Sequence, residues 1–293
     1  SGFGVFLAIA TAFSWALGCV VHTTASRVVG IPAVMLIRQP LASVVLGIFC
    51  LIWAIYASVA AFVWLAAASG VFGIIIGDAC QYAGALTIGL RPAQCANRFL
   101  MLTALFGSIY LNEYIGLQGW FGMFVATCGV ILVVLSEQRD AKPSRIHKQR
   151  NKGVIISLLA AVFVALGIVF SKQALQEGIG ALPLAFYRNA ISTVGICGGL
   201  AFGAIRPAFG NLKANPGILK LFPLGCLFGP AGGIWLSCVA LDYLPAAVAA
   251  MLIGLQPIAL LIITGIMERR IPAPNSIIGS IIACTGAAIL LLR

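Results

Sequence analysis

A single carboxylate interrupts one of the most apolar stretches of this chain. Asp78 lies in the segment GIIIGDACQY, residues 73–82, and the 293 residues include only seven acidic side chains. In the middle of a lipid bilayer a charged side chain costs on the order of 2.5–3.5 kcal/mol, so a carboxylate there needs a partner or a proton. Gln81 and Tyr82 follow at i+3 and i+4, on the same face of a helix. These three side chains are the first candidates for a polar binding site.

Three interpretations of Asp78 stay open on the sequence alone. Arg98, with Asn97 beside it, lies two turns into the next apolar segment and would form an ion pair with the carboxylate. Alternatively, the carboxylate binds an amine of a solute, or it carries a proton that is coupled to transport. Asn97 and Arg98 therefore join the candidate binding residues.

A polar stripe runs along the first apolar segment, residues 3–22. At positions i, i+4, i+7 and i+11, one helical face holds Thr11, Trp15, Gly18 and His22. Lipid offers no hydrogen-bond partners, so such a stripe faces either a neighbouring helix or a wet cavity. Trp15 and His22 are candidate cavity residues, and a position at the membrane interface is the alternative for His22.

The second half of the chain offers an interrupted helix. The stretch LFGPAGGIWLSC, residues 227–238, combines a proline with three glycines, and Trp235 and Ser237 follow them. The next apolar segment has Gln256-Pro257 at its middle. Hydrophobic segments interrupted by glycine and proline point to binding sites in transporters. Trp235, Ser237 and Gln256 are therefore candidate substrate-binding residues.

The composition requires lipid as the solvent for most of these segments. The chain is 61% hydrophobic and 9% charged, whereas a soluble domain has roughly 25% charged residues. The nine cysteines form no CxxC pair and no cluster with histidine, so we expect neither a metal nor another cofactor.

Polar, glycine and proline breaks divide the chain into ten apolar segments, most of them near the roughly 20 residues that cross a bilayer. They are residues 3–22, 32–55, 60–87, 92–111, 117–136, 153–175, 182–204, 218–242, 245–267 and 274–292. The basic run EQRDAKPSRIHKQRNK separates five from five. The sequence thus predicts three parts, residues 1–136, a linker loop at 137–152, and residues 153–293.

The two halves resemble each other in sequence. Residues 4–22 align with 153–171, sharing GV and ALG, and LIRQPLAS (36–43) aligns with FYRNAIST (186–193). Since each half has an odd number of spans, the second must enter the membrane from the opposite side. The predicted fold is therefore all-α and integral to the membrane, with ten transmembrane helices in two inverted five-helix repeats around a central cavity.

Duplicated charges are expected to belong to the scaffold. Arg38 pairs with Arg188 in this alignment, and Glu113 pairs with Glu268 at a helix end. We interpret the arginines as snorkelling towards the headgroups or capping carbonyls, with contact to a substrate as the alternative, and the glutamates as interfacial. Asp78 has no acidic counterpart, because Gly233 or Ile234 stands at the equivalent position.

The distribution of lysine and arginine predicts the orientation. Most of these residues, including those of the 137–152 loop, fall on one side of the ten-segment arrangement. The positive-inside rule places that side in the cytoplasm and both termini on the other side. In the inner membrane of a bacterium, the termini would be periplasmic.

The second half carries a resemblance to a known family. The passage ALDYLPAAVAAMLIGLQPIALLIITGIMERR (240–270), with its aromatic-x-Pro turn, mid-helix Pro257 and a glutamate eleven residues later, resembles the EamA-type family of the drug/metabolite transporter superfamily. A glycine-containing final helix, 279–286, follows. The first half departs from the pattern, with Arg91-Pro92 at its turn. The resemblance implies ten helices, a central cavity, and export of metabolites or amino acids, aromatic amino acids included.

Three classes of function compete. The first is a secondary transporter that exports small metabolites, most of all amino acids, with export or facilitation of other amphipathic metabolites or drugs as its variant. The second is an intramembrane enzyme, but GxSxG, HExxH and P-loop motifs do not occur, so we expect no catalysis. The third is a structural or signalling bundle. We expect a small-molecule substrate, a lipid bilayer, protons as a candidate coupling ion, no nucleic acid, and function as a monomer.

Overall fold

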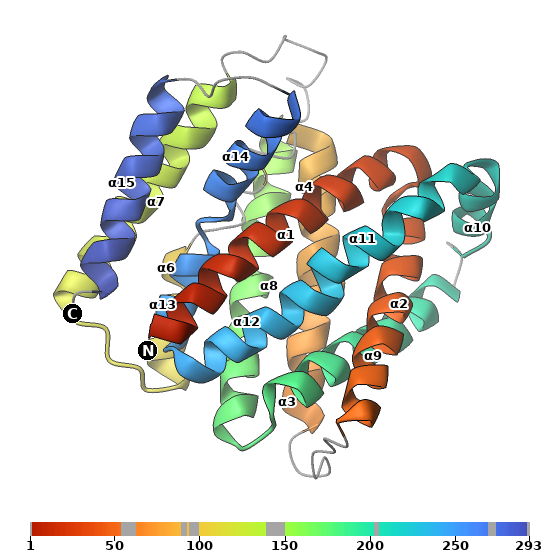
Figure 1. Cartoon of the computed structure of the whole chain (residues 1–293), viewed down its shortest axis with the longest axis horizontal. Coiled ribbons are helices and arrows are strands. Elements are labelled where there is room, and N and C mark those ends of the chain that lie inside the picture. Colours follow the sequence, from red (N-terminus) through yellow and green to blue (C-terminus); the bar gives the residue numbers. More distant parts are fainter. Residues whose placement is uncertain are drawn as a thin grey trace.

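Helices form all the regular structure of the described chain (Figure 1). This computed structural model describes residues 2–53, 63–88, 93, 100–138, 150–201, 205–268 and 274–291, and no strand occurs among them. A helix satisfies its own backbone hydrogen bonds, which is why apolar segments of this length adopt it in lipid.

The elements fall on either side of the basic linker. Before it lie α1 (Gly2–Val29), α2 (Ile31–Ile52), α3 (Val63–Ser69), the π-helix η1 (Gly70–Asp78), α4 (Ala79–Ile88), α6 (Leu100–Tyr110) and α7 (Leu117–Gln138). After it lie α8 (Arg150–Gln176), α9 (Ala181–Ala201), α10 (Ile205–Ala214), the 3₁₀ helix η3 (Pro216–Leu221), α11 (Phe222–Cys226), the π-helix η4 (Leu227–Ala231), α12 (Gly232–Tyr243), α13 (Ala246–Ile253), α14 (Gln256–Glu268) and α15 (Pro274–Leu291).

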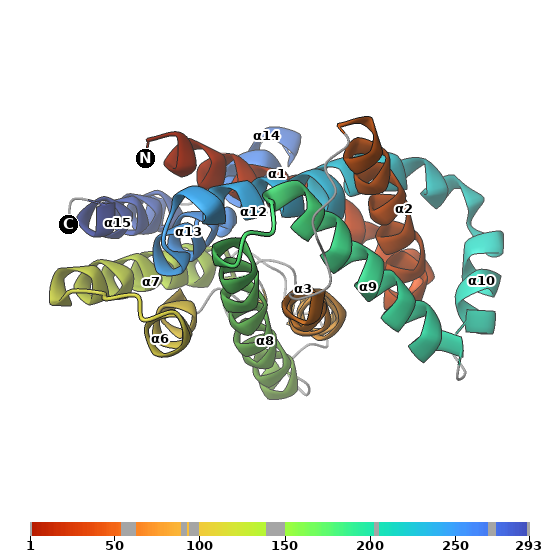
Figure 2. The ribbon, with the colours of Figure 1, turned by 90° about the horizontal axis from the view of Figure 1, so that it is seen from below.

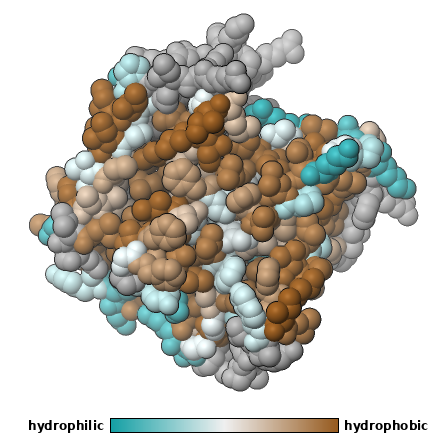
Figure 3. Space-filling model, viewed as in Figure 1, coloured by the Kyte–Doolittle hydropathy of each residue, from teal (hydrophilic) through white to brown (hydrophobic). Residues whose placement is uncertain are grey.

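Seven helical runs of the described chain are long and apolar enough to cross a membrane. They are Gly2–Val29, Ile31–Ile52, Val63–Ile88, Asn151–Gln176, Pro216–Tyr243, Ala246–Met267 and Pro274–Leu291. Large apolar side chains also cover much of the outer surface, as Figure 3 shows for one face. The prediction of an all-α protein with membrane spans is confirmed, and the number of ten spans stays a prediction.

Helices from the two halves pack against one another rather than forming separate bundles. α1 packs along η4 and α12, and α8 packs along η1 and α4. α2 packs against α9, and α7 lies beside α15 at one edge of the molecule (Figures 1 and 2). α13 lies in the core, where every one of its residues is buried.

Two close approaches of backbone, the glycine crossings, bring the first helix of each half against the π-helix of the other. A Cβ added to Gly18 of α1 would lie 2.8 Å from the Cα of Gly229 in η4. A Cβ added to Gly167 of α8 would lie 2.6 Å from the Cα of Gly73 in η1. Real Cβ atoms do not approach this closely, so only glycine allows these helices to cross at this distance.

The π-helices leave carbonyl groups that side chains of other helices satisfy. Ser14 donates to the Phe228 carbonyl at 2.7 Å, and Asn189 donates to the Pro230 carbonyl at 3.1 Å. In η1, the Gly70 carbonyl accepts from Ser192 at 3.1 Å. Proline and glycine in these segments interrupt the regular i to i+4 pattern, and the freed carbonyls are then bonded by buried hydroxyl and amide groups.

Substitution of Gly167 tests the glycine crossings. We expect Gly167→Ala to lower the stability of the fold by about 1–3 kcal/mol, because its methyl group must push two backbones apart. Gly198→Ala in α9 is the matched control, since nothing lies within 4 Å of a Cβ there. Thermal unfolding in detergent measures both, and equal midpoints for the two variants would contradict the close crossing.

Candidate functional site

A cavity of about 70 Å³ lies between the two halves. Residues of α1, α2, η1, α4, α8, α9, η4, α12, α13 and α14 line it. This volume is room for a few water molecules. Among the residues selected from the sequence, the following line it: Trp15, His22, Asp78, Gln81, Tyr82, Ser237 and Gln256.

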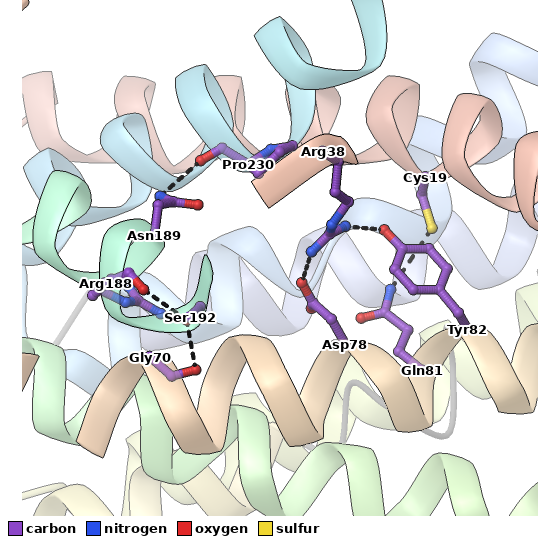
Figure 4. Close-up of polar contacts among 10 residues, drawn as sticks. All are labelled: Cys19, Arg38, Gly70, Asp78, Gln81, Tyr82, Arg188, Asn189, Ser192 and Pro230. Atoms are coloured by element: carbon purple, nitrogen blue, oxygen red, sulfur yellow. Dashed lines mark hydrogen bonds and ion pairs between the residues drawn. The ribbon is translucent and has the colours of Figure 1, made fainter. Parts of the chain in front are cut away.

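The first charged group in the cavity is an ion pair between α2 and η1 (Figure 4). Arg38 donates from Nη2 to the Oδ2 of Asp78 and from Nη1 to the hydroxyl of Tyr82. Its guanidinium carbon lies 5.1 Å from the centre of the Tyr82 ring, which adds a cation–π contact. The expectation that Arg38 snorkels to the headgroups is wrong, because its side chain is buried inside the protein.

The structure gives Asp78 a partner, Arg38, that the sequence analysis did not consider for this role. The expected ion pair with Arg98 falls outside the described residues, as does Asn97. Within the described part of the chain, the carboxylate pairs with Arg38. Gln81, one turn further along α4, donates to the Sγ of Cys19 on α1 at 3.7 Å.

The second charged group is the guanidinium of Arg188 on α9. Its side chain is buried and lines the cavity, so the prediction that it reaches towards the headgroups is also wrong. Nη1 donates to the Sγ of Cys238 on α12 at 3.7 Å. Nη2 lies against Gly73 of η1, where an added Cβ would be 3.2 Å away. Arg188 thus reaches from the second half to the π-helix of the first.

His22 is buried among protein side chains beside the cavity. It is 1% exposed, and its ring packs against Tyr82 and Phe222, with centroid separations of 6.3 and 6.5 Å. Cβ atoms at Gly225 and Gly229 would lie 2.9 and 2.8 Å from the ring. These glycines therefore make the space that the imidazole occupies beside the cavity.

Trp235 lies outside the cavity, unlike the other aromatic candidates. Its ring stacks on Phe49 at 6.3 Å and contacts Trp53 at 6.0 Å, both at the end of α2. Ser237, two residues later, does line the cavity, and it donates to the carbonyl of Ile234 at 2.7 Å.

Two charged side chains bind the turn between α12 and α13, beyond the cavity residues Leu241 and Ile253. Lys172 of α8 donates to the carbonyls of Leu241 and Leu244 at 2.6 and 3.0 Å. Glu113 accepts from the first two amides of α13 at 2.8 and 3.4 Å. A cation at a helix C-terminus and an anion at an N-terminus are both stabilising. We call Lys172 and Glu113 the turn clamp.

Arg38 and Arg188 were considered from the sequence as substrate contacts, but a scaffold role was preferred for both. The available signal was their position about two turns inside apolar helices, where a charge is costly. Their duplication suggested a role in the scaffold instead. In addition, a long side chain at this position can reach the headgroups. Both side chains are buried inside the protein, so neither reaches the headgroups.

The fold and the cavity define a membrane-embedded helical protein with buried charges between two halves. A family model described as the EamA-like transporter family matches residues 2–135 and 151–292. The chain belongs to this family, and it is therefore a multi-pass membrane protein related to transporters of small solutes.

One solved structure supports the fold. It is described as a crystal structure of a protein, and it superposes with a TM-score of 0.75 at 14% identity, covering 99% of this chain and 96% of its own. No curated protein matches the chain significantly.

A double-mutant cycle tests the buried ion pair. Asp78→Asn leaves the buried guanidinium of Arg38 without an anion and should cost about 3–5 kcal/mol. Arg38→Gln leaves only the partly exposed carboxylate of Asp78 unpaired, so it should cost less. The double variant buries no unpaired charge and should unfold at a temperature closer to that of the wild type than either single variant does. Thermal unfolding in detergent provides the comparison. Additive losses in the double variant would show that the two groups act independently.

Proposed function

We propose that this protein is a secondary transporter that exports small metabolites by alternating access, with amino acids, including aromatic and hydrophobic ones, as the leading substrate class. The supporting observation is the cavity between the halves, which combines buried guanidinium groups and a partly buried carboxylate with aromatic rings. Trp15, His22, Gln81, Ser237 and Gln256 are proposed to contact the substrate. Facilitated export of other amphipathic metabolites or drugs is the alternative.

We infer that the halves are five-helix repeats of inverted topology. At each glycine crossing, the first helix of one half contacts the π-helix of the other half, as a two-fold relation would require. Ser43 and Thr193, which align in the repeat, hydrogen-bond to each other at 2.9 Å. Equivalent residues meet in this way beside a two-fold axis. Such repeats commonly exchange access to a central site by rocking against each other.

Transport by this cavity requires an opening motion. A cavity of about 70 Å³ holds a few water molecules rather than an amino acid. The turn clamp holds the α12–α13 turn beyond one end of the cavity. We propose that release of this clamp accompanies opening on that side, with the glycine crossings as the points of rotation.

The proposed orientation follows from the charges. The turn clamp and the N-terminal residues of α1 share one end of the molecule, since a Cβ at Gly4 would lie 2.9 Å from Leu244. We place this end in the periplasm of a bacterial inner membrane and the 137–152 loop in the cytoplasm, by the positive-inside rule.

Counterflow into liposomes tests the transport function. Vesicles preloaded with an unlabelled amino acid should accumulate the labelled form faster with the protein than without it, across a panel of amino acids. The same assay with and without a pH gradient measures proton coupling. Absence of flux for every amino acid and amphipathic metabolite in the panel would contradict the proposed function.

Asp78 and Glu113 should differ in their effect on flux. Asp78→Asn leaves Arg38 without its anion in the cavity, so we expect a clear change in transport rate or in its pH dependence. Glu113→Gln keeps an oxygen that can accept from the α13 amides, so its effect should be smaller. Rates are normalised to the protein inserted in the vesicles. Equal effects of the two substitutions would argue against a role for Asp78 in the cavity.

A further inference from the structure

The two cavity arginines make equivalent contacts with one of their nitrogens. Arg38 and Arg188 align in the repeat, and each donates from Nη1 to the third apolar segment of its own half. The acceptor is the Tyr82 hydroxyl in the first half and the Cys238 thiol in the second. Tyr82 and Cys238 therefore occupy equivalent places around their arginines.

This equivalence selects the counterpart of Asp78. Asp78 precedes Tyr82 by four residues, and Ile234 precedes Cys238 by four residues. Ile234 is 5% exposed and lines the cavity. An apolar side chain thus stands in the second half where the first half has the carboxylate that neutralises its arginine.

Among the residues that the structure describes, the charge of Arg188 consequently has no anionic partner. The ion pair of the described residues is the one between Arg38 and Asp78, and the guanidinium of Arg188 has only the Cys238 thiol as an acceptor among them. Its Nε has no hydrogen-bond partner in the same part of the chain. A thiol is a weak acceptor, and a buried cation is costly until an anion pairs with it.

We propose that Arg188 binds the carboxylate of the transported solute, which takes the place that Asp78 has beside Arg38. An arginine holds a carboxylate through parallel hydrogen bonds, so this contact also orients the solute. The ammonium group of an amino acid is not required, because the carboxylate of Asp78 is already bound to Arg38. The solute class is therefore organic carboxylates with an apolar body, including amino acids held through their carboxylate. This inference rests on the proposed function in one respect, namely that the bound carboxylate is the solute that the protein transports.

Ligand-induced thermal stabilisation of the detergent-purified full chain tests the contact. The probes are 3-phenylpropionate, 2-phenylethylamine and phenylalanine, together with 4-methylpentanoate, isoamylamine and leucine as a second apolar body. A bound ligand raises the unfolding midpoint according to its concentration and affinity. We expect every carboxylate to stabilise the wild type and both amines to leave its midpoint unchanged.

Two kinds of variant distinguish a loss of anion binding from a loss of folding. Arg188→Gln should weaken carboxylate binding by roughly 10- to 100-fold, the worth of a charge-assisted hydrogen bond. Ile234→Asp keeps Arg188 but supplies an internal carboxylate, so it should abolish binding of the probes without lowering the midpoint of the ligand-free protein. Ile234→Asn is its matched control, and it should still bind carboxylates because it adds no charge.

The outcomes distinguish this proposal from the transport function. Stabilisation by the amines equal to that by the carboxylates, or no stabilisation by any carboxylate, would overturn it. Carboxylate binding that survives in both Arg188→Gln and Ile234→Asp would overturn it as well. Carboxylate binding without flux in liposomes would leave the anion site standing and reject transport. Flux of the amines as fast as that of the carboxylates would leave transport standing and reject the anion site.

Discussion

The cost of a buried charge in lipid governs the arrangement of this molecule. The side chain of Arg38 is buried, so its charge needs an anion, and the partly buried carboxylate of Asp78 supplies it. Their ion pair joins α2 to the π-helix of the third segment and brings Tyr82 into the same network. Within the described part of the chain, the guanidinium of Arg38 is neutralised by Asp78, whereas that of Arg188 has no anion beside it.

Small residues make this electrostatic arrangement possible. Helices in lipid gain little from burying apolar surface, so close contact depends on glycine and on hydrogen bonds between helices. At the two glycine crossings, α1 and α8 approach the π-helices of the opposite halves. The carbonyls that the π-helices release are then bonded by Ser14, Asn189 and Ser192. Contacts with few long side chains can slide, which fits the alternating access that we propose.

Much of the fold could be predicted from sequence, and the site only in part. Hydrophobic length and the repeat indicated membrane helices, and the cost of an isolated carboxylate pointed correctly to Asp78 as a cavity residue. The side on which Trp235 lies was not predictable from a 3.6-residue period, since the preceding π-helix changes the helical face of the residues after it. The burial of Arg188 depends on how α9 packs against η1, which no local pattern contains.

A structure of the protein with bound 3-(4-bromophenyl)propionate tests the central claim most directly, since the bromine identifies the apolar body and fixes the direction of the ligand. We expect the carboxylate oxygens to lie about 3 Å from the guanidinium of Arg188, beside Ile234, with Arg38 and Asp78 still paired. A carboxylate bound to Arg38 with Asp78 displaced, or a ligand bound away from both arginines, would contradict it.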